Sequence, residues 1–152
     1  MTEYRFYQLG RSNLSHALMG ILPKALERGM RAHILCASME RMRDLDARLW
    51  ADDPGSFLPH GAAGGGDEAR QPVLLSTADG LPANDAKLLI LTDGADTGQP
   101  GLYDMVCVML DGGDENALAA GRAQWAAAKG AGHKLSYWAQ EPNGAWKQQA
   151  AG

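Results

Sequence analysis

Histidines and loop aspartates are the residues of this sequence that could do acid–base or metal chemistry. His60, in the stretch 56–60 (SFLPH), could be a general base if a carboxylate or nucleophile lay beside it, and Asp93 and Asp96 follow an apolar run. The four histidines (His16, His33, His60 and His133) show no HExxH or HxH spacing, which gives a metal site little support. Local hydrogen bonding by His60 and turn formation by the aspartates are the ordinary interpretations. A small hydrolase or transferase that uses His60 and a loop aspartate stays open as an alternative hypothesis.

Phosphate-binding loops are absent from the sequence. The first apolar run, 4–9, is followed by Gly-Arg-Ser-Asn at 10–13, which is neither GxGxxG nor a glycine-rich loop ending in Lys-Ser/Thr. The run GAAGGG at 61–66 follows no predicted strand and opens no predicted helix. We therefore expect no nucleotide cofactor. A degenerate nucleotide-binding domain that holds an anion near Ser12 and Asn13 is a third hypothesis.

The elements that position these residues follow from apolar spacing. Strands are predicted at 4–9, 31–37, 73–76, 87–92, 103–110 and 134–140. Helical spacing recurs at 14–26 and 42–50, and an alanine-rich helix is predicted over 115–129. The last residues, EPNGAWKQQAAG, predict a turn and a frayed end. Apolar strands that alternate with helices predict an α/β fold, a Rossmann-like three-layer sandwich with a mostly parallel sheet and no phosphate-binding loop.

Composition narrows the class of protein. The 152 residues suit one domain, and the net charge of −4 argues against a general nucleic-acid binder. No apolar run approaches the ~20 residues of a membrane span, and the first residues lack the apolar core of a signal peptide. Cys36 and Cys107 lie in strand-like runs, so we expect buried free thiols and a cytoplasmic location.

Large apolar residues gather around the end of the second helix. They are Leu45, Leu49 and Trp50, followed in the next loop by Phe57, Leu58 and Pro59. Such residues can form a local core or an exposed pocket for a partner, and residue type leaves both interpretations open.

The alanine-rich helix carries a second group. At about 100° per residue, Leu118, Arg122, Trp125 and Lys129 share one stripe, and Ala119, Ala120, Ala123, Ala126 and Ala127 lie on another side. Small residues allow close approach, so we expect the alanine side to face the sheet. Trp125 would then be a partly exposed anchor for a peptide, between two cations. The alternative is that Trp125 packs beneath the last predicted strand.

Several of these residues together resemble a known family, the chi subunit of bacterial DNA polymerase III. The similar positions are Leu45, Asp46, Leu49, Trp50, the SFLPH stretch 56–60 and QPVLL at 71–75, then Arg122, Trp125, Lys129, Gly132, His133, Tyr137, Trp138, Gly144 and Trp146. The similarity runs from Tyr4 to about Lys147. It implies one chi-like domain over 1–147 and a C-terminal tail over 148–152.

The resemblance implies an accessory protein of the clamp loader with no catalytic site of its own, within a DNA-directed DNA polymerase holoenzyme. It implies contact with DNA only indirectly, through the C-terminal tail of single-stranded DNA-binding protein. Arg122 matches a basic position that meets this tail, and Trp125 matches an aromatic position that packs against it. Leu118 and Ala126 depart from positions that are basic in some members. Trp50 and Phe57 match aromatic positions that bind the psi subunit of the clamp loader or a helicase of the XPD/DinG type.

Overall fold

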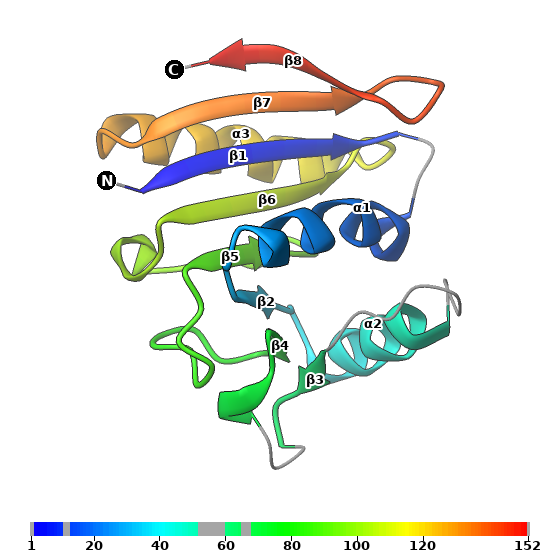
Figure 1. Cartoon of the computed structure of the whole chain (residues 1–152). Helices are drawn as coiled ribbons and strands as arrows, with labels where there is room; N and C mark the ends of the chain where they lie inside the picture. Colours follow the sequence, from blue (N-terminus) through cyan, green and yellow to red (C-terminus); the bar gives the residue numbers. More distant parts are fainter. Residues whose placement is uncertain (1, 11–12, 52–59, 65–67, 152) are drawn as a thin grey trace.

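The structure, a computed structural model, describes residues 2–10, 13–51, 60–64 and 68–151. Figure 1 shows its helices and strands in chain order. They are β1 (Glu3–Leu9), α1 (Leu14–Glu27), β2 (Ala32–Leu35), α2 (Met39–Ala51), β3 (Gly61–Ala62), β4 (Val73–Ser76), β5 (Leu88–Leu91), β6 (Met105–Asp111), α3 (Glu115–Gly130), β7 (Lys134–Gln140) and β8 (Trp146–Ala151), with short 3₁₀ helices at Glu68–Arg70 and Pro100–Leu102.

Within the described residues the strands form one eight-stranded sheet, in the order β3-β4-β2-β5-β6-β1-β7-β8. Neighbouring strands from β3 to β7 are parallel, and β8 runs antiparallel to β7. Parallel neighbours need long crossover connections. Helices α1 and α2 lie on one face of the sheet and α3 lies on the other (Figure 1). The predicted three-layer α/β sandwich with a mostly parallel sheet is confirmed.

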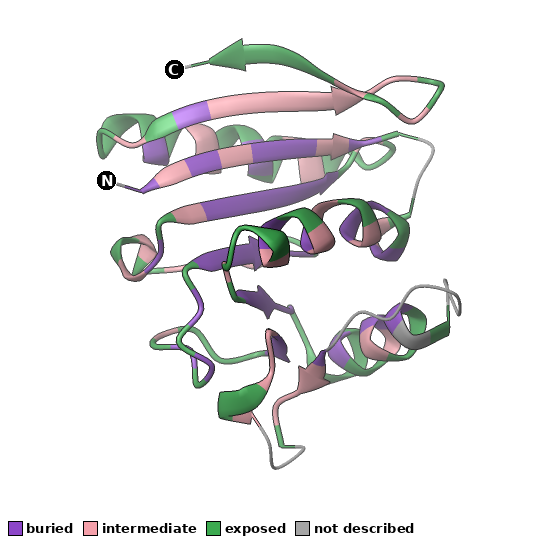
Figure 2. Cartoon of the chain, viewed as in Figure 1, coloured by how far each residue is buried: buried purple, intermediate pink, exposed green. Residues whose placement is uncertain are grey.

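The C-terminal residues differ from the sequence prediction. Residues 146–151 form β8 at the edge of the sheet, where a turn and a frayed end were expected. After Trp146 this strand is exposed along its length (Figure 2). An edge strand with polar side chains on both faces lacks the apolar alternation by which strands are predicted. Backbone pairing with β7 and the half-buried Trp146 hold it in place.

The sheet separates two hydrophobic cores. One core lies under α1 and α2 and includes Leu18, Leu22, Ile34, Ile90 and Cys107. The other lies under α3 and includes Phe6, Leu89, Val106, Leu110 and Leu135. All four residues of β5 and most residues of β6 are buried (Figure 2), which explains their continuous apolar sequence.

Both cysteines are buried free thiols, as predicted. Burial raises the pKa of Cys36 to about 11 and the pKa of Cys107 to about 12, so neither is a reactive thiolate near neutral pH. Among the described helices, none combines the length and apolar character needed to cross a membrane.

A buried histidine links three parts of the fold. His33 on β2 has its Nδ1 2.9 Å from the Tyr103 hydroxyl and its Nε2 2.8 Å from Ser76 Oγ, on β4. A neutral imidazole satisfies both partners, because one nitrogen donates and the other accepts. Burial lowers the pKa of His33 to about 4, although the negative charge of Asp79 opposes this shift.

We predict that this histidine makes the protein sensitive to mild acid. Its pKa falls from 6.5 to about 4 on folding, so the unfolded chain binds the proton more readily and the free energy of unfolding falls between these values as the pH is lowered. The loss attributable to one group is at most about 1.4 kcal/mol per pH unit. Urea unfolding from pH 7 to pH 4 should show a steeper decline for the wild type than for His33→Gln. Exposed His16→Gln is the control, and equal slopes for wild type and His33→Gln would contradict the prediction.

Candidate protein-binding site

Helix α3 rests on the sheet through a different side from the one expected. Gly121 and Ala128 are buried, and Leu118 and Trp125 are half-buried against the core. The alanines that were predicted to face the sheet (Ala119, Ala120, Ala123, Ala126 and Ala127) are exposed. The prediction failed because burying an indole and a leucine removes much more apolar surface from water than burying alanine methyl groups. The residues that allow close approach are Gly121 and Ala128.

Trp125 stands in an aromatic group on the α3 face of the sheet. Its ring centroid lies 5.4 Å from that of Phe6 and 6.1 Å from that of Tyr137, which it meets edge-on at 66°. Phe6 and Tyr137 are partners across β1 and β7, and their rings stack at 6.2 Å. These contacts fix the orientation of the indole and leave part of it open to solvent. The inner side of the indole thus packs beneath β7, as in the alternative interpretation, and its outer side is open to solvent.

Two cations flank this indole on α3. Arg122 and Lys129 are exposed, and they lie about one turn before and one turn after Trp125. Burial raises the pKa of Tyr137, and the positive charge of Arg122 opposes this shift. The Tyr137 hydroxyl donates a hydrogen bond to Gln8 Oε1 at 2.7 Å. The structure thus brings Arg122, Trp125 and Lys129 to one edge of α3, where Tyr137 and Gln8 adjoin them.

Sequence reasoning overlooked the residues of β1 that frame this edge. Phe6 is fully buried beneath Trp125, and Gln8 holds the Tyr137 hydroxyl. Their signal in the sequence is the alternation of Tyr4, Phe6 and Gln8 on one face of the first strand. That alternation does not say which helix covers the face.

The second predicted surface lies mostly outside the described residues. Phe57 is among the residues that the structure does not describe, and only the backbone of Trp50, near the end of α2, is described. Leu45 and Leu49 on the same helix are buried in the core.

His60 is buried against α2. Its side chain is 0% exposed, and its Nε2 lies 3.4 Å from the Asp46 carbonyl oxygen and 3.3 Å from Asp46 Oδ1. The His60 Nε2 and Asp46 Oδ1 atoms are close enough for an ion pair, but their geometry is not that of a hydrogen bond. A side chain with no exposed surface cannot reach a substrate. Asp93 instead pairs with Arg41, so the structure does not join His60 to either loop aspartate.

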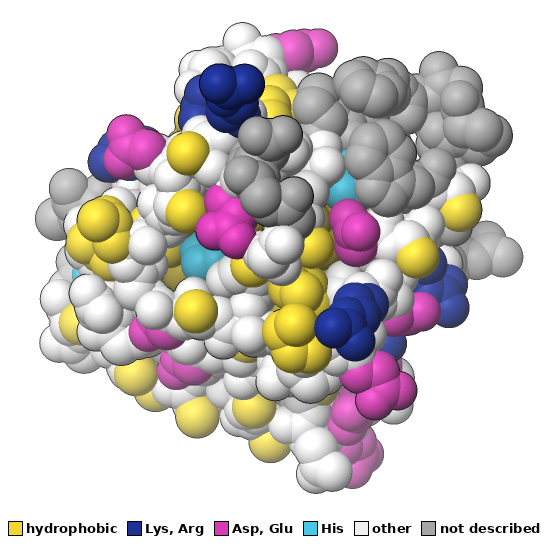
Figure 3. All heavy atoms as spheres, turned by 90° about the horizontal axis from the view of Figure 1, so that it is seen from below, with side chains coloured by type: hydrophobic (Ala, Val, Ile, Leu, Met, Phe, Trp, Pro, Cys, Tyr) yellow, Lys and Arg dark blue, Asp and Glu magenta, His cyan; other side chains and the backbone are white. Residues whose placement is uncertain are grey.

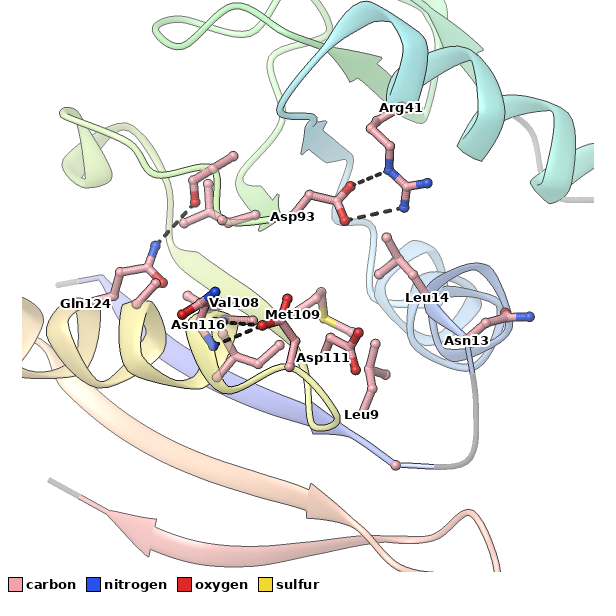
Figure 4. Close-up of a pocket in the computed structure, with 18 residues that line it drawn as sticks. Leu9, Asn13, Leu14, Arg41, Asp93, Val108, Met109, Asp111, Asn116 and Gln124 are labelled. Carbon is pink, nitrogen blue, oxygen red and sulfur yellow. Dashed lines mark hydrogen bonds and ion pairs between the residues drawn. The ribbon is translucent and has the colours of Figure 1, made fainter.

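A cleft of about 580 Å³ opens at the carboxyl ends of β1, β5 and β6 (Figure 4). This is the switch point of the sheet, where proteins of this architecture bind nucleotides. Asp114 caps α3 by accepting hydrogen bonds from the backbone N–H groups of Asn116 and Ala117, at the place where a phosphate would bind. Asp111 and Asp93 also line the cleft, and the one cation among its lining residues, Arg41, is held by Asp93 at 3.1 and 3.3 Å. Carboxylates thus outnumber cations among the described lining residues, which disfavours a nucleotide phosphate here. Of the two residues expected near a bound anion, Asn13 lines the cleft and Ser12 lies outside the described residues.

A mostly parallel sheet covered on both faces, with carboxylates at its switch point, defines a Rossmann-like α/β protein. The chain belongs to the family of the DNA polymerase III chi subunit, HolC, whose model matches residues 1–136. This confirms the resemblance found in the sequence.

A curated relative supports the same assignment. DNA polymerase III subunit chi of Pseudomonas aeruginosa (strain PAO1) is 32% identical to this chain over 93 residues. The matched stretch covers 59% of this chain and 63% of that protein, which is less than two thirds of its length.

The close contact between α3 and β6 leads to a prediction about Gly121. A Cβ atom at this position would lie 2.6 Å from Leu110 Cδ1 on β6, so a larger residue must displace the helix or the leucine. We expect Gly121→Val to lower the free energy of unfolding by about 1–3 kcal/mol, the usual cost of overpacking. The exposed control Ala123→Val should cost less than about 1 kcal/mol, since helix propensity alone is affected. Urea unfolding of both variants measures this difference, and equal losses would show that α3 does not depend on close contact at Gly121.

Proposed function

We propose that this protein is a non-catalytic adaptor of the DNA replication machinery and acts in the cytoplasm. Membership of the chi subunit family carries the proposal. The buried His60 and the pairing of Asp93 with Arg41 support a role without chemistry, because the hydrolase or transferase hypothesis needs an accessible histidine beside a loop aspartate. The adaptor needs no cofactor and no metal.

The first proposed partner is the C-terminal tail of single-stranded DNA-binding protein, at the edge formed by Arg122, Trp125 and Lys129. By the family resemblance this tail is acidic and ends in phenylalanine. Arg122 can hold a terminal carboxylate with two parallel hydrogen bonds, and the open part of the Trp125 indole offers an apolar wall for the last side chain. Lys129 attracts upstream aspartates, although a fully solvated pair contributes little.

Contact with DNA is proposed to be indirect. On the face seen in Figure 3, basic and acidic side chains of the described residues lie interspersed. The net charge of −4 agrees with this mixture. Neutralising a run of DNA phosphates requires a cluster of Lys and Arg, which this surface does not offer.

We predict that Arg122→Ala weakens tail binding more than Lys129→Ala. Arg122 would pair with the end of the peptide that is most shielded from water, whereas Lys129 would act through a screened surface charge. Calorimetric titration with a tail peptide should show an affinity loss of about tenfold or more for Arg122→Ala. Affinity should also fall as salt increases. The exposed Arg43→Ala on α2 is the matched control, with an unchanged Kd.

Two results of this titration would place the tail elsewhere. One is equal affinity for tail peptides with and without the last phenylalanine, and the other is no loss on Arg122→Ala. Trp125→Ala is unsuitable as the main test because the indole packs on Phe6 and Tyr137, so its removal also destabilises the fold.

The second proposed partner is the psi subunit of the clamp loader or a helicase of the XPD/DinG type, bound through Trp50 and Phe57. We predict that Phe57→Ala weakens this partner and changes the free energy of unfolding by less than about 0.5 kcal/mol, as for an exposed residue. Phe6→Ala is the control, because a fully buried phenylalanine should cost about 3–5 kcal/mol. Pull-down and urea unfolding measure the two effects. A comparable loss of stability for Phe57→Ala would identify that residue as core.

A further inference from the structure

A second pocket lies on the α1 face of the sheet, on the opposite side from Trp125. Its volume is about 340 Å³. The floor consists of buried β5 and β6 side chains, Leu88 and Cys107. Tyr7 and Trp146 form an aromatic wall, with ring centroids 5.0 Å apart in an edge-on arrangement. The second half of α1 closes the other side through Gly20 and Ile21.

The rim of this pocket is positively charged. Arg5, Lys24 and Arg28 line it, and no aspartate or glutamate is among its lining residues in the described chain. Arg5 is partly compensated by Glu3, whose Oε2 lies 2.8 Å from Arg5 Nε. Lys24 in the last turn of α1 and Arg28, its C-cap residue, are exposed. Within the described residues neither forms an ion pair with a carboxylate. An occupant with negative charge around an apolar group would complement this arrangement.

Gly20 forms part of the α1 wall of the pocket and has no side chain to fill it. A glycine inside a helix costs about 1 kcal/mol relative to alanine. No heavy atom lies within 4 Å of a Cβ built at Gly20, so close packing within the described chain does not explain the glycine. The missing side chain keeps the α1 wall of the pocket open.

We propose that this pocket binds an acidic segment of a partner protein, with one large apolar side chain inserted between α1 and the Tyr7–Trp146 wall. The floor is made of buried apolar side chains, which suits an inserted side chain better than a nucleic-acid strand. Three cations, one of them already paired, are too few to follow a phosphate backbone in a protein of net charge −4. The pocket and the proposed tail site lie on opposite faces of the sheet, so one molecule can bind both partners at once.

The test uses end-blocked acidic peptides that differ only in a central Ala, Leu, Phe or Trp. Blocked ends remove the terminal carboxylate, which separates this pocket from the proposed site at Arg122. With ¹⁵N-labelled full-length protein, the Leu, Phe or Trp peptides should shift the indole N–H signal of Trp146, assigned with Trp146→Phe. The signal of Trp125 should stay in place, and the Ala peptide should bind about tenfold more weakly or worse.

Matched variants connect the binding to the pocket. A Cβ at Gly20 meets no atom within 4 Å, so Gly20→Leu should extend into the pocket and abolish the Trp146 shift. Gly101→Leu, another open glycine position, should leave the shift intact. Lys24→Glu combined with Arg28→Glu should weaken binding by about tenfold or more. Three results would overturn the proposal: an unmoved Trp146 signal, an unchanged affinity in Gly20→Leu, or tighter binding at Trp146 by a single-stranded oligothymidylate.

Discussion

The central strands β5, β6 and β1 are buried on both faces, and the rest of the structure depends on covering those faces. Alternate side chains of a strand point to opposite sides, so Phe6 enters the core under α3 and Tyr7 enters the core beside α1. Two of the proposed binding surfaces, the edge at Trp125 and the pocket at Trp146, begin at these neighbouring residues of β1. Phe6 supports Trp125 on one face, and Tyr7 supports Trp146 on the other.

Helix α3 shows how covering the sheet also creates a surface for a partner. Gly121 lets the helix approach β6, and this approach brings the indole of Trp125 onto Phe6 and Tyr137. The same packing leaves Arg122 and Lys129 exposed at the edge of the contact between α3 and the sheet. A rigid, half-buried indole loses little conformational entropy when a peptide binds, which is why aromatic anchors of this kind are favoured at interfaces.

At the switch point of the sheet, side chains of this chain cap the helix N-termini. Helix N-termini at this edge would attract a phosphate, but Asp114 satisfies the first N–H groups of α3 from within the chain. Asn13 does the same for α1 by accepting from the backbone N–H of His16. With Asp111 and Asp93 also at the cleft, an incoming phosphate would meet negative charge. Partner binding is accordingly proposed at the helix surfaces and not at the strand ends.

The sequence by itself determined the order of the main helices and strands, the mostly parallel sheet, the absence of a phosphate loop and the family. The signals for these features are local, because apolar periodicity and short motifs can be recognised within a few neighbouring residues. Only the tertiary structure decided which side of α3 meets the sheet, since that choice compares the apolar area of Trp125 with that of the alanines against a surface supplied by β1, β6 and β7. It also decided that 146–151 forms a strand, because β8 depends on β7 as its partner. The pocket beside Trp146 was hidden for the same reason: Arg5, Lys24 and Trp146 are far apart in the chain, and packing of α1 on the sheet brings them together.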